Sequence, residues 1–84
     1  MKKVSVIIPH YNSKLELQNL LKTIPVLEWI DIIVIDDNSN VDIFDLKDRY
    51  KHVRFFRLGI NKKGAGAARN FGLEKAVGDY FLFA

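Results

Sequence analysis

Four consecutive branched apolar residues, Ile32 to Ile35, run directly into the polar stretch Asp36 to Asn40. An apolar run without alternation is typical of a strand that is buried on both faces, as in a parallel sheet covered by helices on both sides. Ligands of such sheets bind beyond the carboxyl ends of the strands. The sequence therefore predicts a buried strand at 32–35 and a polar binding edge immediately after it.

The composition predicts one small domain, which we expect to span residues 1–84. Hydrophobic residues make up 49% of the 84 positions, and a folded chain of this size buries roughly 60% of its unfolded surface. The chain has no cysteine, which excludes disulfides and thiolate chemistry. The first apolar run, Val4 to Ile8, is too short for a signal peptide or a membrane span. We therefore expect a cytoplasmic protein.

Short apolar runs alternate with amphipathic segments along the whole chain. We expect strands at 4–8, 32–35, 53–58 and 79–84, and helices at 13–24, 42–51 and 65–77. The order β-α-β-α-β-α-β with short connections predicts an α/β fold with a doubly wound, mainly parallel sheet. We expect the third strand at one edge and the fourth strand beside the first, where it leaves an open edge.

Local signals support the helix assignments. Ser13 and Glu16 match the capping box S-x-x-E. Small residues recur at steps of three and four from Ala65 to Ala76, which would let the third helix lie close to the sheet. Gly78 is expected to end that helix as a left-handed C-terminal cap.

The common dinucleotide and P-loop motifs do not fit. A Rossmann fingerprint should follow the first strand, but that place holds Pro9 to Asn12, which contain no glycine. Gly64-Ala-Gly66 is a partial match and follows the third strand instead. No Walker A sequence is present, so NAD binding and P-loop chemistry are disfavoured.

Three loops should meet at the carboxyl edge, and together they offer what a nucleotide requires. Tyr11 provides an aromatic face. Asp36 or Asp37 provides an acceptor-only carboxylate that could read the N3–H group of uracil, and strand alternation sends these two side chains to opposite faces. Arg69 lies in the first turns of the helix opened by Gly64, where backbone N–H groups favour a phosphate.

Simpler interpretations remain open for the same residues. The stretch Asp36 to Ser39 could be only a cluster of turn formers, and Arg69 could cover the sheet edge. His10 and His52 have no partner identifiable by spacing, so we interpret both as structural or solvent-facing. Seven basic residues and no acidic one fall between Arg49 and Arg69, which indicates either an anionic partner or a solvated basic face.

Four blocks in this order resemble the family 2 glycosyltransferases of GT-A fold: Val4–Asn12, Val34–Ser39, Lys63–Gly72 and Ala76–Phe83. The resemblance implies the Rossmann-like half of that fold. It also implies inverting transfer from a nucleotide-diphosphate-sugar donor, UDP-linked if an Asp reads the base, to a saccharide or lipid acceptor. A divalent metal, Mn²⁺ or Mg²⁺, is implied as the cofactor of the full-length enzyme.

The resemblance also assigns roles to residues at matching positions. Pro9 and Tyr11 resemble the wall against which the base lies, Asp37 the uracil-reading carboxylate, and Arg69 the basic residue near the phosphates. Gly64 resembles the loop glycine ahead of that residue. The expected nucleotide-binding residues are Pro9, Tyr11, Asn12, Asp36, Asp37, Lys63, Gly64 and Arg69.

The family's metal motif, D-x-D, is expected just after Ala84, and the catalytic base is also expected outside this sequence. We therefore expect the N-terminal nucleotide-binding part of a catalytic domain, which binds nucleotide, holds no metal strongly and is inactive alone. In the full-length protein it would work in the cytoplasm or at the cytoplasmic membrane face. No nucleic acid partner is expected. The alternatives are a non-enzymatic nucleotide- or nucleic-acid-binding module and a fragment that forms homodimers through its open sheet edge.

Overall fold

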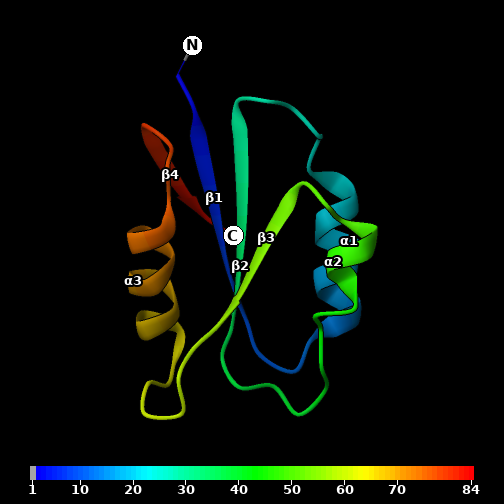
Figure 1. Cartoon of the computed structure of the whole chain (residues 1–84), viewed down its shortest axis with the longest axis vertical. Coiled ribbons are helices and arrows are strands. Elements are labelled where there is room, and N and C mark those ends of the chain that lie inside the picture. The colour runs from blue at the N-terminus through cyan, green and yellow to red at the C-terminus, as the bar shows by residue number, and fades with distance from the viewer. Residues whose placement is uncertain (1) are drawn as a thin grey trace.

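A parallel sheet forms the centre of the molecule, in a computed structural model that describes residues 2–84 (Figure 1). Along the chain the elements are β1 (Val4–His10), α1 (Lys14–Thr23), β2 (Ile30–Asp36), α2 (Leu46–Arg49), β3 (Val53–Arg57), α3 (Ala65–Lys75) and β4 (Tyr80–Phe83). The strand order is β3-β2-β1-β4, and every neighbouring pair is parallel. The predicted doubly wound α/β fold is confirmed, with β3 and β4 at the two edges.

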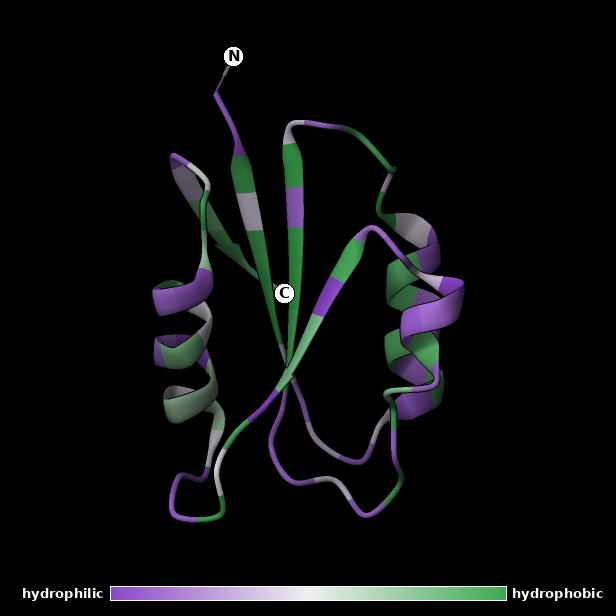
Figure 2. Ribbon diagram, in the orientation of Figure 1, coloured by the Kyte–Doolittle hydropathy of each residue, from purple (hydrophilic) through white to green (hydrophobic). Residues whose placement is uncertain are grey.

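Each face of the sheet has its own core. Alternate residues Val6, Ile8, Ile32 and Val34 pack with the buried leucines of α1 and α2. The intervening residues, including Ile7, Ile33 and Ile35, pack against α3. Figure 2 shows the apolar strands between helices whose outer surfaces are polar. Burial on both faces is the reason why the β2 sequence does not alternate.

Helix α3 lies close to the sheet, as its small residues predicted. A Cβ atom added at Gly72 would overlap Cγ2 of Ile7 and lie 3.0 Å from Cδ1 of Ile35. The prediction for Gly78 was wrong, because α3 ends at Lys75 and Gly78 has no left-handed backbone. Its role is a close approach: an added Cβ would lie 2.7 Å from the backbone nitrogen of Ser5.

Two local predictions about helices were also wrong. Ser13 does precede α1, but its hydroxyl donates to the carbonyl of Tyr11, so no capping box forms. The helix expected at 42–51 is only the four residues of α2. The carboxylate of Asp42 accepts from the amide of Phe44, and this local turn competes with a regular first helical turn.

Strand boundaries differ from the expected ones mainly at the ends. Pro9 and His10 belong to β1, and Asp31 belongs to β2, where it is buried. Strand β4 is apolar, yet its four side chains are 47–59% exposed. No helix within residues 2–84 combines the length and apolar composition that a membrane crossing requires.

Candidate functional site

The loops that follow β1, β2 and β3 gather at the carboxyl edge of the sheet, at the bottom of Figure 1. The register pairs His10 with Asp36 and Asp36 with Arg57, so the ends of three strands lie side by side. The predicted meeting of these loops is confirmed. Strand alternation then decides which side chains point to each face.

Asp36 points to the α1 face and is fully buried. Its carboxylate accepts from Nδ1 of His10 at 2.9 Å and from the amide and hydroxyl of Ser39. The Nε group of Arg57 lies 3.3 Å from the second carboxylate oxygen. With four donors around it, Asp36 is an organiser of the edge and is not open to a ligand.

The protonation of Asp36 follows from these contacts. Burial alone would raise the pKa of its carboxyl, but the hydrogen bonds from Ser39 and His10 outweigh burial and leave the pKa below its ordinary value. Asp36 is therefore a carboxylate at neutral pH. The nearby guanidinium of Arg57 balances its charge.

Asn12 ties the first loop to the second. Its amide N–H donates to Oγ of Ser39, and its side-chain oxygen accepts from the amide of Asn40, both at 2.8 Å. Asn12 adopts a φ of 48°, a left-handed backbone that asparagine tolerates better than most residues. The structure thus places Asn12 in loop-to-loop contacts within the predicted site.

Asp37 points to the opposite face from Asp36, as alternation predicted. One of its carboxylate oxygens accepts from the amide of Gly64 at 2.8 Å. Gly64 precedes α3 with a φ of 95°, a conformation that side chains rarely allow, so the glycine lets its N–H meet the carboxylate. This contact orients the Asp37 carboxylate.

A cavity of about 270 Å³ is lined by Tyr11, Asp37, Asn38 and Lys63. The ring of Tyr11 is 59% exposed and therefore free to stack on a ligand. The amide nitrogen of Asn38 is buried without an acceptor among the described residues. An aromatic face, a carboxylate and a cation therefore line one opening.

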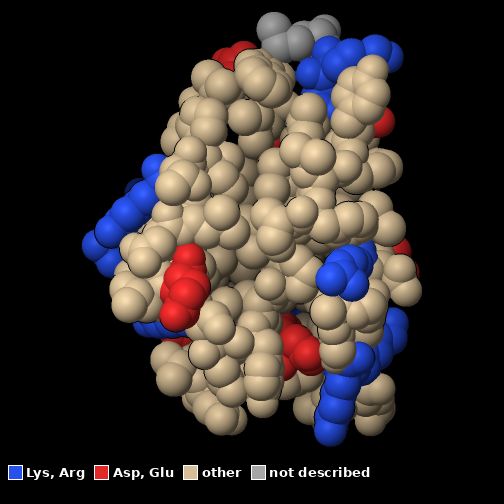
Figure 3. All heavy atoms as spheres, turned by 180° about the vertical axis from the view of Figure 1, so that it is seen from behind, with Lys and Arg blue, Asp and Glu red and all other residues tan. Residues whose placement is uncertain are grey.

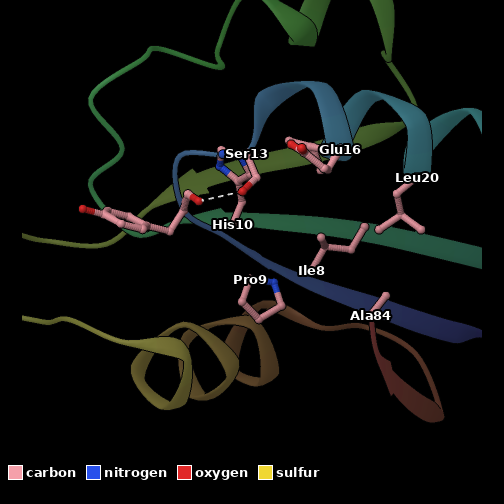
Figure 4. A pocket seen from close by; sticks show the side chains of 9 residues that line it. Ile8, Pro9, His10, Ser13, Glu16, Leu20 and Ala84 are labelled. Atoms are coloured by element: carbon pink, nitrogen blue, oxygen red, sulfur yellow. Dashed lines mark hydrogen bonds between the residues drawn. The ribbon is translucent and has the colours of Figure 1, made fainter.

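Two further hollows adjoin this opening. One, of about 130 Å³, joins Pro9, Tyr11 and Asp37 to the first turns of α3. The other, of about 170 Å³, lies between β1 and α1 and is shown in Figure 4, where His10 lies beneath Ser13 and Glu16. Pro9 lies on the other side of the strand from His10, toward α3. The cavities therefore continue on both sides of the end of β1.

Arg69 is not among the residues that line these cavities. Its guanidinium lies over the ring of Phe83, 5.9 Å from the centroid. The arrangement matches the simpler interpretation, in which this arginine covers the sheet edge through a cation–π contact.

The predicted basic window is divided by the structure. Arg54 pairs with Asp31 and Arg57 pairs with Asp36. These two guanidinium groups neutralise buried carboxylates that stabilise the fold. The window is therefore not one continuous stripe of unpaired cations.

The model of the protein family described as glycosyl transferase family 2 matches residues 5–84. The chain belongs to this family. An uncharacterized glycosyltransferase of Haemophilus influenzae is 39% identical over 89 residues, covering 99% of this chain and 35% of the relative. A Campylobacter jejuni relative, GalNAc(5)-diNAcBac-PP-undecaprenol beta-1,3-glucosyltransferase, is 32% identical, covering 99% of this chain and 29% of its own length.

A solved structure of another family member is similar throughout this chain. The crystal structure of S. aureus TarS 1-349 in complex with UDP-GlcNAc matches with a TM-score of 0.79 and 31% identity. The match covers 98% of this chain and 26% of TarS 1-349. The family 2 chain described here thus spans about a third or less of the length of these relatives.

The metal that the family implies does not fit the residues present. Within residues 2–84, no group of three or more His, Asp or Glu side chains could hold a metal ion. Asp36 is fully surrounded by protein donors, and Asp37 has one oxygen held by Gly64. No step of chemistry is therefore assigned to a metal bound by these side chains.

Sequence reasoning missed the importance of His10, Ser39 and Arg57. His10 was interpreted as structural without a partner, and its partner Asp36 is brought to it by the β1–β2 register. One sequence signal was available: in parallel strands whose apolar runs are aligned, the residues just after the runs are neighbours. The register pairs Pro9 with Ile35, so the true alignment is one residue further along β1 than the run Val4 to Ile8 suggests, and His10 lies beside Asp36.

Proposed function

We propose that this chain is the N-terminal nucleotide-binding part of an inverting family 2 glycosyltransferase that uses a nucleotide-diphosphate-sugar donor, with uridine as the base. The observation that supports it is the opening lined by Tyr11, Asp37 and Lys63. Tyr11 would stack on the base, the free oxygen of Asp37 would accept the N3–H of uracil, and Lys63 would attract the diphosphate.

The family members support this assignment. TarS, whose match covers 98% of this chain, has been crystallised with UDP-GlcNAc. The amide of Gly64 holds one oxygen of Asp37 and leaves the other available. Pro9 lies beside Tyr11 in the adjoining hollow and would complete the wall behind the base. Arg69 would reach the phosphates only by leaving Phe83.

The remaining chemistry is assigned to other parts of a longer protein. The chain spans about a third or less of the length of its relatives. We therefore propose that a D-x-D motif in the rest of the longer protein binds Mn²⁺ or Mg²⁺, and that the catalytic base also lies in that part. Residues 2–84 alone would bind nucleotide and transfer no sugar. The acceptor would be a saccharide or a lipid, and the name of the Campylobacter relative contains both. The reaction is placed in the cytoplasm or at its membrane face.

Nucleotide titration tests the base assignment. We expect calorimetry on the purified chain to show that UDP binds at least about tenfold more tightly than CDP, because N3 of cytosine is an acceptor that a carboxylate repels. Asp37→Ala should lose most of the UDP affinity, and Asp37→Asn should reduce the preference for UDP over CDP, since an amide also donates.

Asp48→Asn is the matched control, because Asp48 is exposed on α2 and does not line the opening. It should bind both nucleotides as the unmodified chain does. Equal affinity for CDP and UDP, or an Asp37→Ala variant with unchanged UDP affinity, would contradict the proposal.

A second role, self-association, is favoured by one observation. Strand β4 is an apolar edge strand with both faces exposed. Seen from behind, most of the surface carries no charge, with Lys and Arg mainly near its margins and a few Asp or Glu side chains within it (Figure 3). Edge strands of this kind pair readily with another chain, so we propose that the isolated chain forms homodimers through β4.

A further inference from the structure

His10 is the last residue of β1, and its side chain is 3% exposed. The two ring nitrogens have different partners. Nδ1 lies 2.9 Å from a carboxylate oxygen of Asp36, and Nε2 lies 3.0 Å from the backbone nitrogen of Ser13. A backbone amide can only donate, so Nε2 must accept. The proton therefore resides on Nδ1, and the ring is neutral in one tautomer.

This ring joins three segments of the candidate site. Ser13 is the residue that precedes α1, Asp36 ends β2, and the carbonyl of His10 accepts from the amide of Asp37 at 2.8 Å. Tyr11 lies between His10 and Ser13 in the chain. The two hydrogen bonds of the imidazole hold the residues on either side of the Tyr11–Asn12 pair, and the contacts of Asn12 with Ser39 and Asn40 hold the loop from the other side.

On the basis of the proposed nucleotide site, we propose that His10 is a positioning residue whose neutral Nδ1–H tautomer holds Tyr11 opposite Asp37, and that protonation of Nε2 weakens nucleotide binding. A protonated Nε2 would face the amide of Ser13, and two donors cannot share a hydrogen bond. The start of α1 would then move away and carry Tyr11 with it.

Four charged side chains surround His10, and they come from α1, from β2 and the loop after it, and from β3. Asp36 of β2 remains a carboxylate in the neutral range because its pKa is depressed, and Arg57 of β3 is a permanent cation. Glu16 of α1 lines the same hollow as His10, and Asp37 lines the hollow on the other side. Glu16 is therefore the side chain to neutralise as a control.

The test is UDP affinity between about pH 8 and about pH 5.5, the range in which histidine titrates. The terminal phosphate of UDP also titrates near pH 6, so the readout is the affinity of the unmodified chain divided by that of each variant at the same pH. His10→Asn keeps a donor toward Asp36 and loses the acceptor for Ser13. His10→Gln keeps an acceptor at the position of Nε2.

We expect His10→Asn to bind UDP about tenfold more weakly than the unmodified chain at pH 8, and this ratio to fall toward one as the pH is lowered. His10→Gln should keep most of the affinity, with a constant ratio to His10→Asn at all pH values. Glu16→Gln should follow the unmodified chain throughout. A ratio for His10→Asn that does not change with pH would overturn the proposal.

Nitrogen-15 NMR gives a readout independent of the nucleotide. The ring shifts of His10 should report the Nδ1–H tautomer at pH 8, and the protection of the Ser13 amide, which is the slowing of its exchange relative to the intrinsic rate at the same pH, should fall as the ring is protonated. A Ser13 protection that is the same at pH 8 and at pH 5.5 would overturn the proposal even if the variants did not fold. If the unmodified chain binds no UDP at any pH, the proposed nucleotide site fails, and the NMR result still decides the role of His10.

Discussion

Two buried carboxylates, Asp31 and Asp36, lie near opposite ends of β2, and each has an arginine partner from β3. Asp31 accepts from two nitrogens of Arg54 and from the hydroxyl of Ser5. Burial alone would raise the pKa of Asp31, but these hydrogen bonds and the charge of Arg54 lower it further than burial raises it. Both carboxylates therefore stabilise the fold while they are ionised.

The sign of the pH dependence follows from the depressed pKa values. Each carboxyl releases its proton more easily in the folded chain, so its contribution is complete above the unfolded value of about 3.9 and is lost as the pH falls through the folded value. We expect urea unfolding to give a lower free energy of unfolding at pH 3 than at pH 6. Asp31→Asn should lower the free energy of unfolding by about 2 kcal/mol at neutral pH. The free energy of unfolding of this variant should also fall less steeply between pH 6 and pH 3 than that of the unmodified chain. A variant as stable as the unmodified chain would contradict the role given to Asp31, and Asp48→Asn provides the neutral control.

The direction in which a side chain points could be predicted from the sequence where it depends on one strand alone. The opposite orientation of Asp36 and Asp37 follows from alternation alone, and the structure confirms it. The environment of His10 depends on Asp36, which lies 26 positions away. Such a contact is set by strand register, and no local pattern around either residue reveals it.

At the level of elements, the contact between α3 and the sheet is set by Gly72. A methyl group at this position would meet Ile7 and Ile35, and neither side chain has free space in the packed core. Gly66 lies in the same helix with nothing within 4 Å of an added Cβ. The two glycines therefore form a matched pair for substitution.

Gly72→Ala should lower the free energy of unfolding by about 1–3 kcal/mol, the usual cost of overpacking a core. Gly66→Ala should raise it by about 0.5–1 kcal/mol, because alanine favours the helix over the unfolded chain. Chemical denaturation of both variants measures the difference. Equal effects at the two positions would show that α3 does not pack on the sheet as described.

The elements could be predicted to different degrees. Strands β1 and β2 were found because their apolar runs are buried between helices on both faces of the sheet, and α1 was found from its leucine stripe. The helix expected at 42–51 was wrong because Ile43 and Leu46 are buried by a turn and one short helix, a pattern with the same spacing as a longer helix. Periodicity reports which residues are buried and does not report the hydrogen bonds between them.

At the scale of the whole molecule, the two edges of the sheet are very different. Strand β3 carries Arg54 and Arg57, whose charges discourage edge pairing, whereas β4 presents only aromatic and aliphatic side chains. The open edge beside β1 was predicted from strand order, and the structure confirms that position. How much of this surface stays exposed could not be predicted, because exposure depends on the absence of a helix over β4.

We expect sedimentation of the purified chain to show concentration-dependent dimers. Leu82→Lys should shift the equilibrium toward monomer by about tenfold or more, because a charge in a paired apolar strand is desolvated. Leu15→Lys is the control, since Leu15 is equally apolar and exposed on α1, away from the edge. A monomer at all concentrations, or equal effects of both substitutions, would contradict association through β4.

The two pairs, Asp31–Arg54 and Asp36–Arg57, also specify how β3 aligns with β2. Asp31 lies on the α3 face, near the backbone of Val77, and Asp36 lies on the α1 face, near His10. A slip of β3 by one residue would send both arginines to the wrong face, and a slip by two would separate both pairs at once. Each misaligned state would leave both buried carboxylates without their arginine counter-charges, which is costly for a buried ion. The two pairs therefore disfavour competing registers and give β3, the edge strand that leads into the loop with Lys63, a single alignment.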